Sequence, residues 1–587
     1  MKKIKFFQEL VFQKISSSFK LLSVALKILS QKEKIILFVS FIVFIISSGA
    51  ILWRINNIYS VEIQDIGGEL NEGVVGAPRF INPLLAVSDT DRDLIKLIYG
   101  GLMDTDGKRN LFPVLASKYE IGENGLAYTF YINQKARWHD GKPVKSDDVI
   151  FTIKLAKDPI LNSLKRASWE GVEVEKIDDY TVRFWLKAPY AGFLENTTLP
   201  ILPKHIWEKI MPEEMSLSNF NIQPIGSGPF KVKKIYRDSS GIISSYKLKA
   251  NKNFILGRPF VRYLNIYFFN SEEKLIDAYR RDKINITGFI SPINLRNVLR
   301  KESVARNLTL PRIFGAFFNS ANNPIFAEKE IREALNSAID KKFIIDEVLG
   351  GYGSTINSPI PPGSIGFSTF EENNLSRDEK TEQAKKMLEK NGWKPGKDGI
   401  FEKKVRKETM RLNFTVSTSN VPDMAKTAEI LKDAWEKMGA KVELKFFENS
   451  DFNQNVIRKR NYEILLFGEM VGREPDPFVF WHSSQRNDPG LNIAMYANAK
   501  VDKLLEEART EIDSERRIKK YAAFLKEIEN DQPAIFLYSP YFVYIIPDFL
   551  KGFETENIAV PSERFSAIHK WFIYIRQVWP IFVPVVK

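Results

Sequence analysis

The stretch RWHDGKPVKSDDVIFTIK, residues 137–154, is the part of the sequence whose interpretation decides the rest. It brings His139 and three aspartates together, and metal sites and catalytic sites use the same residue types. These residues also suit a turn that leads into a helix. The two interpretations predict different proteins, so the choice between them comes first.

The turn-and-helix interpretation accounts for each residue of this stretch. Asp140-Gly141, followed by Pro143, is typical of a tight turn. Ser146 is a favourable N-cap, because its hydroxyl can accept a hydrogen bond from a free amide of the first helical turn. Asp147 and Asp148 would then lie where negative charge suits the helix dipole. We therefore expect a structural element here, with no metal or catalytic site.

The length of the chain and its hydrophobic pattern predict an α/β protein with at least two lobes. The chain has 587 residues, and a single hydrophobic core stops growing at roughly 250–300. Expected strands and helices mix along it, which fits an α/β or an α+β class, and we favour α/β. The strands are expected at 126–132, 181–186 and 441–447, and the helices at 147–156, 329–348, 379–391, 423–438, 500–509 and 515–530.

Short motifs in a fixed order carry a resemblance to a known family. Each is weak alone, but together they extend over residues 76 to 545. They are RFINP (79–83), IYGGL (98–102), PVLA (113–116), WHDG (138–141), PIGSGPF (224–230), NP (323–324), REAL (332–335), the turn 359–363, NGW (391–393), DP (476–477) and LNIAMYANAKVDKLL (491–505). In this order they resemble the family-5 extracellular solute-binding proteins, the peptide- and nickel-type receptors of ABC importers.

The resemblance implies a bilobal, clam-shell fold of the periplasmic-binding-protein-like type II, with an extra subdomain in the first lobe. A ligand would bind between the lobes and shift an open–closed equilibrium. The expected parts are a basic cytoplasmic segment at 1–34, a transmembrane anchor at 35–53, a stalk at 54–75, a discontinuous lobe I at 76–312 plus 541–587 with its subdomain at about 95–200, and lobe II at 313–540.

One uncharged run, IILFVSFIVFIISSGAILW at 35–53, is long enough to cross a membrane. At about 1.5 Å per residue it spans roughly 28 Å, close to the thickness of a bilayer core. Lys32 and Lys34 precede it, so the positive-inside rule places the N-terminus in the cytoplasm and the rest of the chain outside. A cleaved signal peptide with small residues at 48–50 is the alternative. We favour the retained anchor, because 34 residues are long for the segment before a signal core. Residues 4–29 look amphipathic and are expected on the inner membrane surface.

Composition excludes several classes of function. The net charge is +13, but eight lysines against two glutamates in residues 1–34 carry almost half of it. The remainder shows no dense basic block, so no nucleic acid partner is expected. The chain has no cysteine, and therefore no disulfide, thiolate metal site or lipid-bearing cysteine. No HExxH or GxSxG motif occurs, so we expect no enzyme, no metal and no cofactor.

The candidate ligand contacts come from the resemblance and lie mainly in the loop FGEMVGREPD, residues 467–476. In peptide-binding relatives an aspartate of this loop pairs with the amino terminus of the ligand, but here the matching place is Val471-Gly472. Glu469 and Glu474 could supply that charge instead. The candidate set is Glu469, Arg473, Glu474, Asp476, Trp481 and Asn319. The alternative is a solvated loop for the charged residues and core packing for Trp481 and His482.

These observations predict a membrane-anchored, monomeric binding protein that captures oligopeptides and delivers them to an ABC permease. One alternative is a sensory or adaptor ectodomain on the same fold. Another is a binding protein for an oligosaccharide, a nickel chelate or haem, and an exported hydrolase is the least favoured. The aromatic C-terminus HKWFIYIRQVWPIFVPVVK, residues 569–587, either packs into lobe I, which we favour, or contacts the membrane or a permease.

Overall fold

The computed structural model describes residues 28–108, 110–122, 124–367, 375–405 and 408–580. Most of the amphipathic segment predicted at 4–29 lies outside these described residues. The chain divides into two compact units. The larger unit, Ile66–Ile573, is called the body, and the smaller one, Met1–Asp65 with Tyr574–Lys587, is called the terminal unit.

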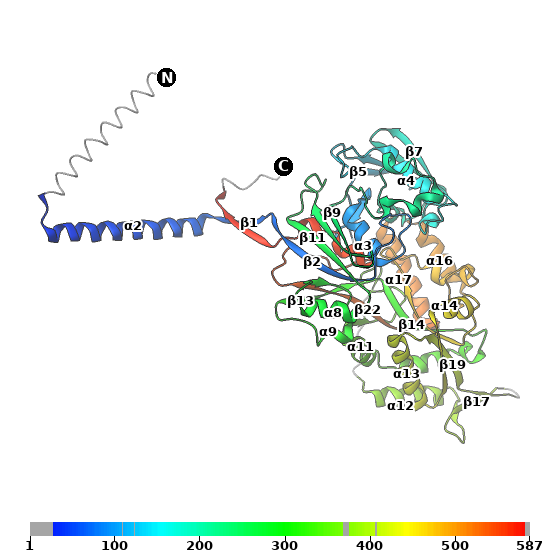
Figure 1. The fold of residues 1–587 in the computed structure, drawn as a ribbon. Coiled ribbons are helices and arrows are strands. Elements are labelled where there is room, and N and C mark those ends of the chain that lie inside the picture. The colour runs from blue at the N-terminus through cyan, green and yellow to red at the C-terminus, as the bar shows by residue number, and fades with distance from the viewer. Residues whose placement is uncertain (1–27, 109, 123, 368–374, 406–407, 581–587) are drawn as a thin grey trace. The chain divides into compact units, whose positions relative to one another are not determined.

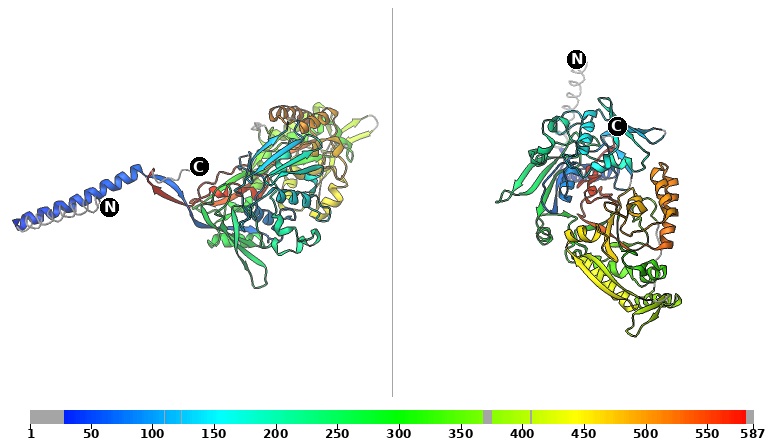
Figure 2. Two further views of the ribbon diagram at one scale, coloured as in Figure 1. Left: turned by 90° about the horizontal axis from the view of Figure 1, so that it is seen from above. Right: turned by 90° about the vertical axis from the view of Figure 1, so that its right-hand side faces the viewer.

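One twelve-stranded mixed sheet runs through the body (Figures 1 and 2). Its strands follow the order β20-β19-β21-β14-β22-β12-β2-β11-β10-β9, and β13 and β15 also pair with β22. The bounds are β2 Gly67–Val75, β9 Phe230–Arg237, β10 Ile243–Ala250, β11 Val261–Phe269, β12 Ile286–Thr287, β13 Ser303–Thr309, β14 Arg312–Phe318, β15 Gly353–Thr355, β19 Asn413–Ser419, β20 Lys441–Phe447, β21 Ile464–Met470 and β22 Ala534–Pro547.

The chain passes twice between separate hydrophobic cores, once at the β13–β14 connection and once within β22. Leu310 packs in one core and Ile313, three residues later, packs in another. Along β22, Leu537 belongs to the second part of the body and Tyr544 to the first. We call these parts lobe I and lobe II. The lobe limits predicted at 312/313 and 540/541 lie within these two crossings.

Lobe I carries a separate four-stranded sheet, in the order β5-β6-β8-β7, within the range expected for the extra subdomain. In β8, Val182 and Phe184 are buried while Trp185 points outward, which is the alternation of a strand with one face on a core. The elements of this lobe are α3 Asp89–Ile98, β3 Met103–Thr105, β4 Leu111–Pro113, β5 Ala116–Ile121, β6 Ala127–Ile132, α4 Ser146–Lys157, α5 Arg166–Trp169, β7 Val172–Asp178, β8 Thr181–Leu186, α6 Phe193–Asn196, α7 Lys204–Trp207, α8 Glu272–Arg280 and α9 Pro292–Leu295.

Lobe II packs helices on both faces of its strands, so β21 is apolar on both sides. Ile464 and Leu466 face one core and Leu465 faces the other. The helix predicted over 329–348 is two helices, because Asp340 caps a new one by accepting a hydrogen bond from the Phe343 amide. The elements are α10 Lys329–Ser337, α11 Lys341–Leu349, α12 Arg377–Lys390, β16 Lys394–Pro395, β17 Phe401–Val405, β18 Glu408–Arg411, α13 Pro422–Lys437, α14 Asn449–Asp451, α15 Phe478–Trp481, α16 Ala499–Thr510 and α17 Ser514–Asp531.

The stretch 137–154 forms the expected turn and helix, with one correction. Gly141 has φ +95° and donates a hydrogen bond to the Trp138 carbonyl, which closes the turn. The prediction that Ser146 is the N-cap is wrong. Ser146 is the first residue of α4, and its hydroxyl donates to the Asp178 carbonyl across the subdomain. The carboxylate of Asp148 instead accepts the free amide that precedes the helix.

His139 is a structural residue that holds the PIGSGPF turn. Its Nδ1 accepts a hydrogen bond from the Gly226 amide at 3.3 Å, and its Nε2 lies 3.1 Å from the Gly228 carbonyl oxygen. Both contacts suit a neutral imidazole with the proton on Nε2. Burial lowers the pKa of His139 to about 4, so this tautomer persists at neutral pH. Two of the motifs that carry the family resemblance therefore bind each other.

The terminal unit contains one long apolar helix, α2 Gln31–Tyr59, and a two-stranded ribbon of β1 Val61–Asp65 with β23 Tyr574–Val578. Residues Gln31–Asn56 of α2 are long and apolar enough to cross a membrane. Two expectations need correction here. The range 54–75 is not one stalk, because Gly67–Val75 is β2 of the central sheet, with Leu70 and Val74 buried. Of the C-terminal stretch 569–587, Trp571 is buried in the lobe I core as favoured, residues 574–578 pair with β1 in the terminal unit, and residues 581–587 lie outside the described residues.

Candidate functional site

The carboxyl-terminal ends of β19 and β21 lie on lobe II near the crossing at Arg312, and we take them as one wall of the candidate cleft. A cavity of about 330 Å³ opens there on lobe II. Gly468 allows the close packing of this wall, since a Cβ at that position would lie 2.5 Å from the ring of Phe314. The lining residues are Arg312, Phe314, Ser419, Met424, Phe467, Gly468, Glu469 and Met470.

One edge of β21 is unpaired where it lines this wall. Its pairing with β19 includes only Ile464 and Leu465, whereas its pairing with β14 continues to Met470. In the part of the chain that the structure describes, no strand covers the second edge of residues 467–470. An open edge of this kind presents backbone donors and acceptors to which an extended peptide can add as a further strand.

Arg312 supplies a positive charge at the same wall. Its guanidinium makes no hydrogen bond or ion pair within the described residues, although it is partly buried. Burial lowers the pKa of Arg312, and Asp89 at the start of α3 in lobe I opposes that effect. A half-buried guanidinium with no direct partner suits a carboxylate that arrives with a ligand.

The other wall belongs to lobe I and lies at the carboxyl-terminal ends of β2 and β11. A cavity of about 530 Å³ is lined there by Gly76, Ala77, Asp238, Ile242, Ile243, Ser244, Phe268, Phe269, Asn270 and Lys274. Gly76 and Ala77 are exposed and directly follow β2. The Thr90 hydroxyl lies about 3.0 Å from where a Cβ of Gly76 would be, so this segment adjoins the first turn of α3 and thus Asp89. Both walls therefore border the junction between Asp89 and Arg312.

Glu469, a predicted ligand contact, is a buried carboxyl group. Only 5% of its surface is exposed, and its Oε2 has no hydrogen-bond partner within the described residues. It lies opposite Ile313 and on the same face of β21 as Leu465, which is a core face. Burial raises its pKa well above the usual value, which disfavours the charged carboxylate. It is poorly suited to pair with a charged amino terminus.

Arg473 connects the two lobes. It forms ion pairs with Glu195 of the subdomain, at 3.4 Å, and with Glu563 in the C-terminal part of lobe I. Nearby, the backbone amide of Ala191 donates to the Arg509 carbonyl of lobe II. The two lobes are thus in direct contact at this end of the cleft, and Arg473 holds them together.

The other predicted contacts have partners inside lobe II. Glu474 pairs with Arg517 at 2.8 Å, and Asp476 pairs with Arg509 at 3.1 Å. Burial raises the pKa of both carboxyl groups. Trp481 is 2% exposed and packs against core aromatics, as the packing alternative expected.

Asn319 does not belong with the others. It lies beyond the far end of β14, opposite the end that carries Arg312, and its side chain bonds the Arg460 carbonyl at 3.0 Å. The strand places it roughly 23 Å from the cleft, because seven residues separate the two positions at about 3.3 Å each. The structure therefore brings Glu469, Arg473, Glu474 and Asp476 to one region and leaves Asn319 outside it.

The contact of Glu195 with Arg473 predicts a pH-dependent stability. Burial raises the pKa of Glu195 to about 7, with Arg473 opposing the shift and Glu563 adding to it. The folded protein therefore holds a proton that the unfolded chain releases near its ordinary value of 4.5. This contribution to stability is complete below that value and is lost as the pH rises through about 7.

We expect the Glu195→Gln variant to lose less thermal stability than the wild type between about pH 5 and about pH 8. Glutamine keeps the neutral shape of the side chain at every pH. Melting temperatures over that range measure the difference. Glu120→Gln, at an exposed subdomain site, should keep the wild-type slope. Parallel curves for Glu195→Gln and the wild type would show that Glu195 is not the titrating group.

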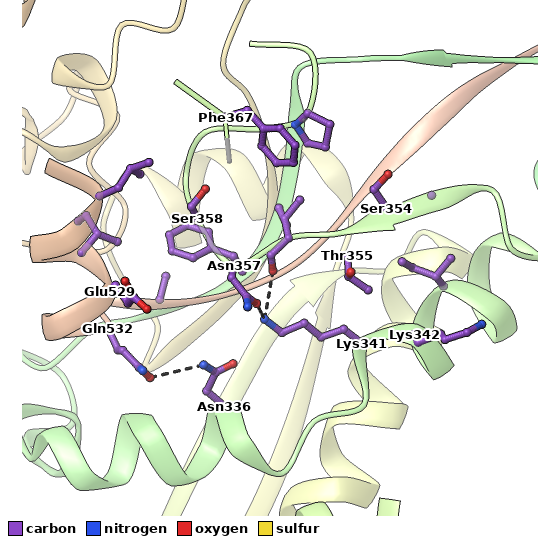
Figure 3. A pocket seen from close by; sticks show the side chains of 18 of the residues that line it. Asn336, Lys341, Lys342, Ser354, Thr355, Asn357, Ser358, Phe367, Glu529 and Gln532 are labelled. Atoms are coloured by element: carbon purple, nitrogen blue, oxygen red, sulfur yellow. Dashed lines mark hydrogen bonds between the residues drawn. The ribbon is translucent and has the colours of Figure 1, made fainter. Parts of the chain in front are cut away.

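A cavity of about 670 Å³ lies elsewhere, within lobe II (Figure 3). It is bordered by α10, α11, β15 and α17. Lys341 points across it and donates to the Ile356 carbonyl at 3.1 Å and to Asn357. Only lobe II lines it, and Lys341, the charged group that crosses it, is already bonded within that lobe. The wall at Arg312 is the better candidate, because it carries an open strand edge and a guanidinium with no direct partner in the described residues.

The comparisons with known proteins agree with this geometry. The sequence pattern of the bacterial extracellular solute-binding proteins, family 5 (middle part), matches residues 110–492. The chain belongs to this family. The oligopeptide-binding protein AppA of Bacillus subtilis (strain 168) is 29% identical over 520 residues, which cover 86% of this chain and 92% of AppA. The dipeptide-binding protein of Escherichia coli (strain K12) is 24% identical over 494 residues, covering 79% and 87%.

Solved structures of the family extend the likeness to the fold. AppA from Bacillus subtilis in complex with a nonapeptide superposes with a TM-score of 0.65 and 27% identity, covering 87% of this chain and 100% of AppA. NikZ from Campylobacter jejuni in complex with Ni(L-His) gives 0.66 and 27%, covering 86% and 99%. The predicted family and the predicted periplasmic-binding-protein-like fold class are confirmed. The chain is a family-5 solute-binding protein of ABC importers.

Sequence reasoning missed Arg312, the most suitable ligand partner in the cleft. Its position was visible as the first residue after Pro311 at the predicted lobe limit, but nothing local marks it as a ligand contact. Within the described residues, no group of three or more His, Asp or Glu side chains could hold a metal ion.

Proposed function

We propose that this protein captures oligopeptides in the inter-lobe cleft and delivers them to an ABC permease. The observation that carries the proposal is the open edge of β21 beyond Leu465, beside Arg312. An extended peptide can bond to that edge through its backbone, whatever its side chains. Arg312 pairs with a ligand carboxylate, and the buried Glu469 lies on the core face of β21.

Titration calorimetry of the full chain with short peptides of graded length tests this function. Heat of binding is expected with peptides and not with free sugars. Heat from sugars or metal chelates, with no response to any peptide, would contradict it. The similarity to NikZ makes a nickel–histidine complex the most informative non-peptide ligand to include.

Arg312→Gln should weaken the binding of peptides with a free carboxylate by about 10- to 100-fold. A hydrogen bond to a charged group contributes about 1.5–3 kcal/mol, and each 1.4 kcal/mol is tenfold in affinity. Peptides with an amidated C-terminus and no acidic side chain should bind the variant and the wild type alike. Arg411→Gln, at a site on β18 outside the cleft, is the matched control. Equal affinities of the Arg312 variant and the wild type for free-acid peptides would exclude Arg312 as the carboxylate partner.

The same proposal retains α2 as a membrane anchor, with the body outside the cell. The helix is continuous from Gln31 to Tyr59, and its apolar side chains are largely exposed. The protein has no cysteine that could carry a lipid, so the helix is the available tether. The molecular mass of the protein extracted from membranes distinguishes a retained helix from one cleaved after Ala50.

A further inference from the structure

The C-terminal strand returns the chain to the end of the apolar helix. In the ribbon, β23 runs antiparallel to β1, with Val578 opposite Val61 and Tyr574 opposite Asp65. Strand β1 leads away from α2, so β23 leads back toward it. The Nε1 of Trp579 then donates to the side-chain oxygen of Asn56, in the last turns of α2, at 2.8 Å. A second bond joins Ser60 to Gln577 at 3.4 Å.

This arrangement sets Trp579 at a defined level along the helix. Trp53 ends the uncharged run, and Asn56 lies three residues later, or about 4.5 Å further along the axis. The interfacial layer of a bilayer is roughly 5–8 Å thick on each side. With the uncharged run in the hydrocarbon core, Asn56 and its partner Trp579 lie within that layer.

The apolar side chains of the ribbon also need a surface to pack against, and the described residues of the terminal unit do not provide one. A two-stranded ribbon alone is marginally stable in water. Its apolar side chains are largely exposed, at 50% for Ile575, 41% for Trp579 and 39% for Val61. The adjoining Tyr59 is 60% exposed. Tryptophan and tyrosine are enriched where one end of a ring is apolar and the other is wet, as at a membrane surface.

We propose that Trp579 inserts into the lipid headgroup layer beside α2, so that the C-terminal strand is a second membrane contact of the protein. The inference rests on the proposed function, because it requires α2 to span the bilayer. A single helix fixes one end of the ribbon, and Trp579 fixes the returning strand at the same surface. The partner is the lipid interface, to which the indole presents an apolar ring while Asn56 accepts its N–H.

Quenching of tryptophan fluorescence by brominated lipid tests this placement in the full chain. The protein has ten tryptophans, and only those in contact with lipid are quenched. Seven are fully buried in the body: Trp138, Trp169, Trp207, Trp393, Trp435, Trp481 and Trp571. The others are Trp53, Trp185 and Trp579. The full chain is reconstituted in vesicles brominated near the headgroup end of the acyl chains, with unbrominated vesicles as reference.

The proposal predicts that Trp53→Phe and Trp579→Phe each remove about half of the quenchable emission. Trp185→Phe, at an exposed site of the subdomain, should remove none. Complete loss of quenching in Trp53→Phe would overturn the proposal and leave the anchor intact. No quenching in the wild type would instead overturn the anchor itself. Phenylalanine at position 53 or 579 leaves the β1–β23 backbone pairing in place. The quenching of the wild type is measured without any substitution, so it does not depend on how a variant folds.

Discussion

Replacing Arg564 by alanine should lower the free energy of unfolding by about 3–5 kcal/mol, the cost of breaking a buried ion pair. The guanidinium is fully buried and donates to Glu72 at 2.7 Å and to Asp93 at 2.6 Å. The second oxygen of Glu72 accepts the Tyr544 hydroxyl at 2.6 Å. The cluster joins β2, α3, β22 and the C-terminal segment, which are far apart in the sequence.

The effect is large because the variant leaves two carboxyl groups buried without their counter-charge. Burial already raises the pKa of Glu72 and of Asp93, and the attraction of Arg564 opposes that rise. Without Arg564 both groups must take up protons or draw water into the core. Urea unfolding followed by far-UV circular dichroism measures the loss of unfolding free energy. The proton uptake should appear as a steeper dependence of that free energy on pH.

A matched control separates the effect of the buried ion pair from the effect of removing an exposed arginine. Arg377 pairs with Asp433 at 2.9 Å, but both side chains are about half exposed. Arg377→Ala should cost less than about 1 kcal/mol, as exposed ion pairs do. The triple variant Arg564→Met, Glu72→Gln and Asp93→Asn should recover part of the stability, because it leaves no buried charge. A cost below 1 kcal/mol for Arg564→Ala would show that water reaches the cluster.

The sequence predicts a strand or a helix well where a single residue pattern extends over the whole element. The strands expected at 181–186 and 441–447 coincide with β8 and β20, because their β-branched and aromatic residues favour extended structure. The break between α10 and α11 was missed, since the apolar period of 329–348 continues across Asp340. The prediction that Ser146 is the N-cap was wrong, because its hydroxyl donates to the Asp178 carbonyl, thirty-two residues away.

The candidate site was less predictable, because side-chain direction there depends on tertiary packing. The sequence ILLFGEM of β21 is apolar on both faces, so its alternation cannot tell which way Glu469 points. Arg312 becomes a cleft residue only through the position where β14 begins after the lobe crossing. The β1–β23 pairing links residues more than 500 positions apart and leaves no local signal.

Gly226→Ala should destabilise the protein by about 3 kcal/mol, at the upper end of the usual cost of overpacking. A Cβ at residue 226 would lie 2.0 Å from the carbonyl oxygen of Ile98 at the end of α3. The backbone carbonyl of Ile98 cannot rotate away from the added Cβ, as the end of a flexible side chain could. The turn is also held by His139, which accepts the Gly226 amide and contacts the Gly228 carbonyl. Thermal unfolding of the variant measures the loss.

Gly241→Ala is the control, since its Cβ would meet nothing within 4 Å and only its positive φ of +80° resists the change. It should cost about 1 kcal/mol, the strain of a non-glycine residue in that conformation. Equal costs for the two variants would mean that the turn moves away from α3 freely. A larger loss for Gly226→Ala shows that the PIGSGPF turn is packed tightly against the backbone at the end of α3. His139 then serves the fold, and Arg312, which we propose as the partner of the ligand carboxylate, lies at the lobe crossing.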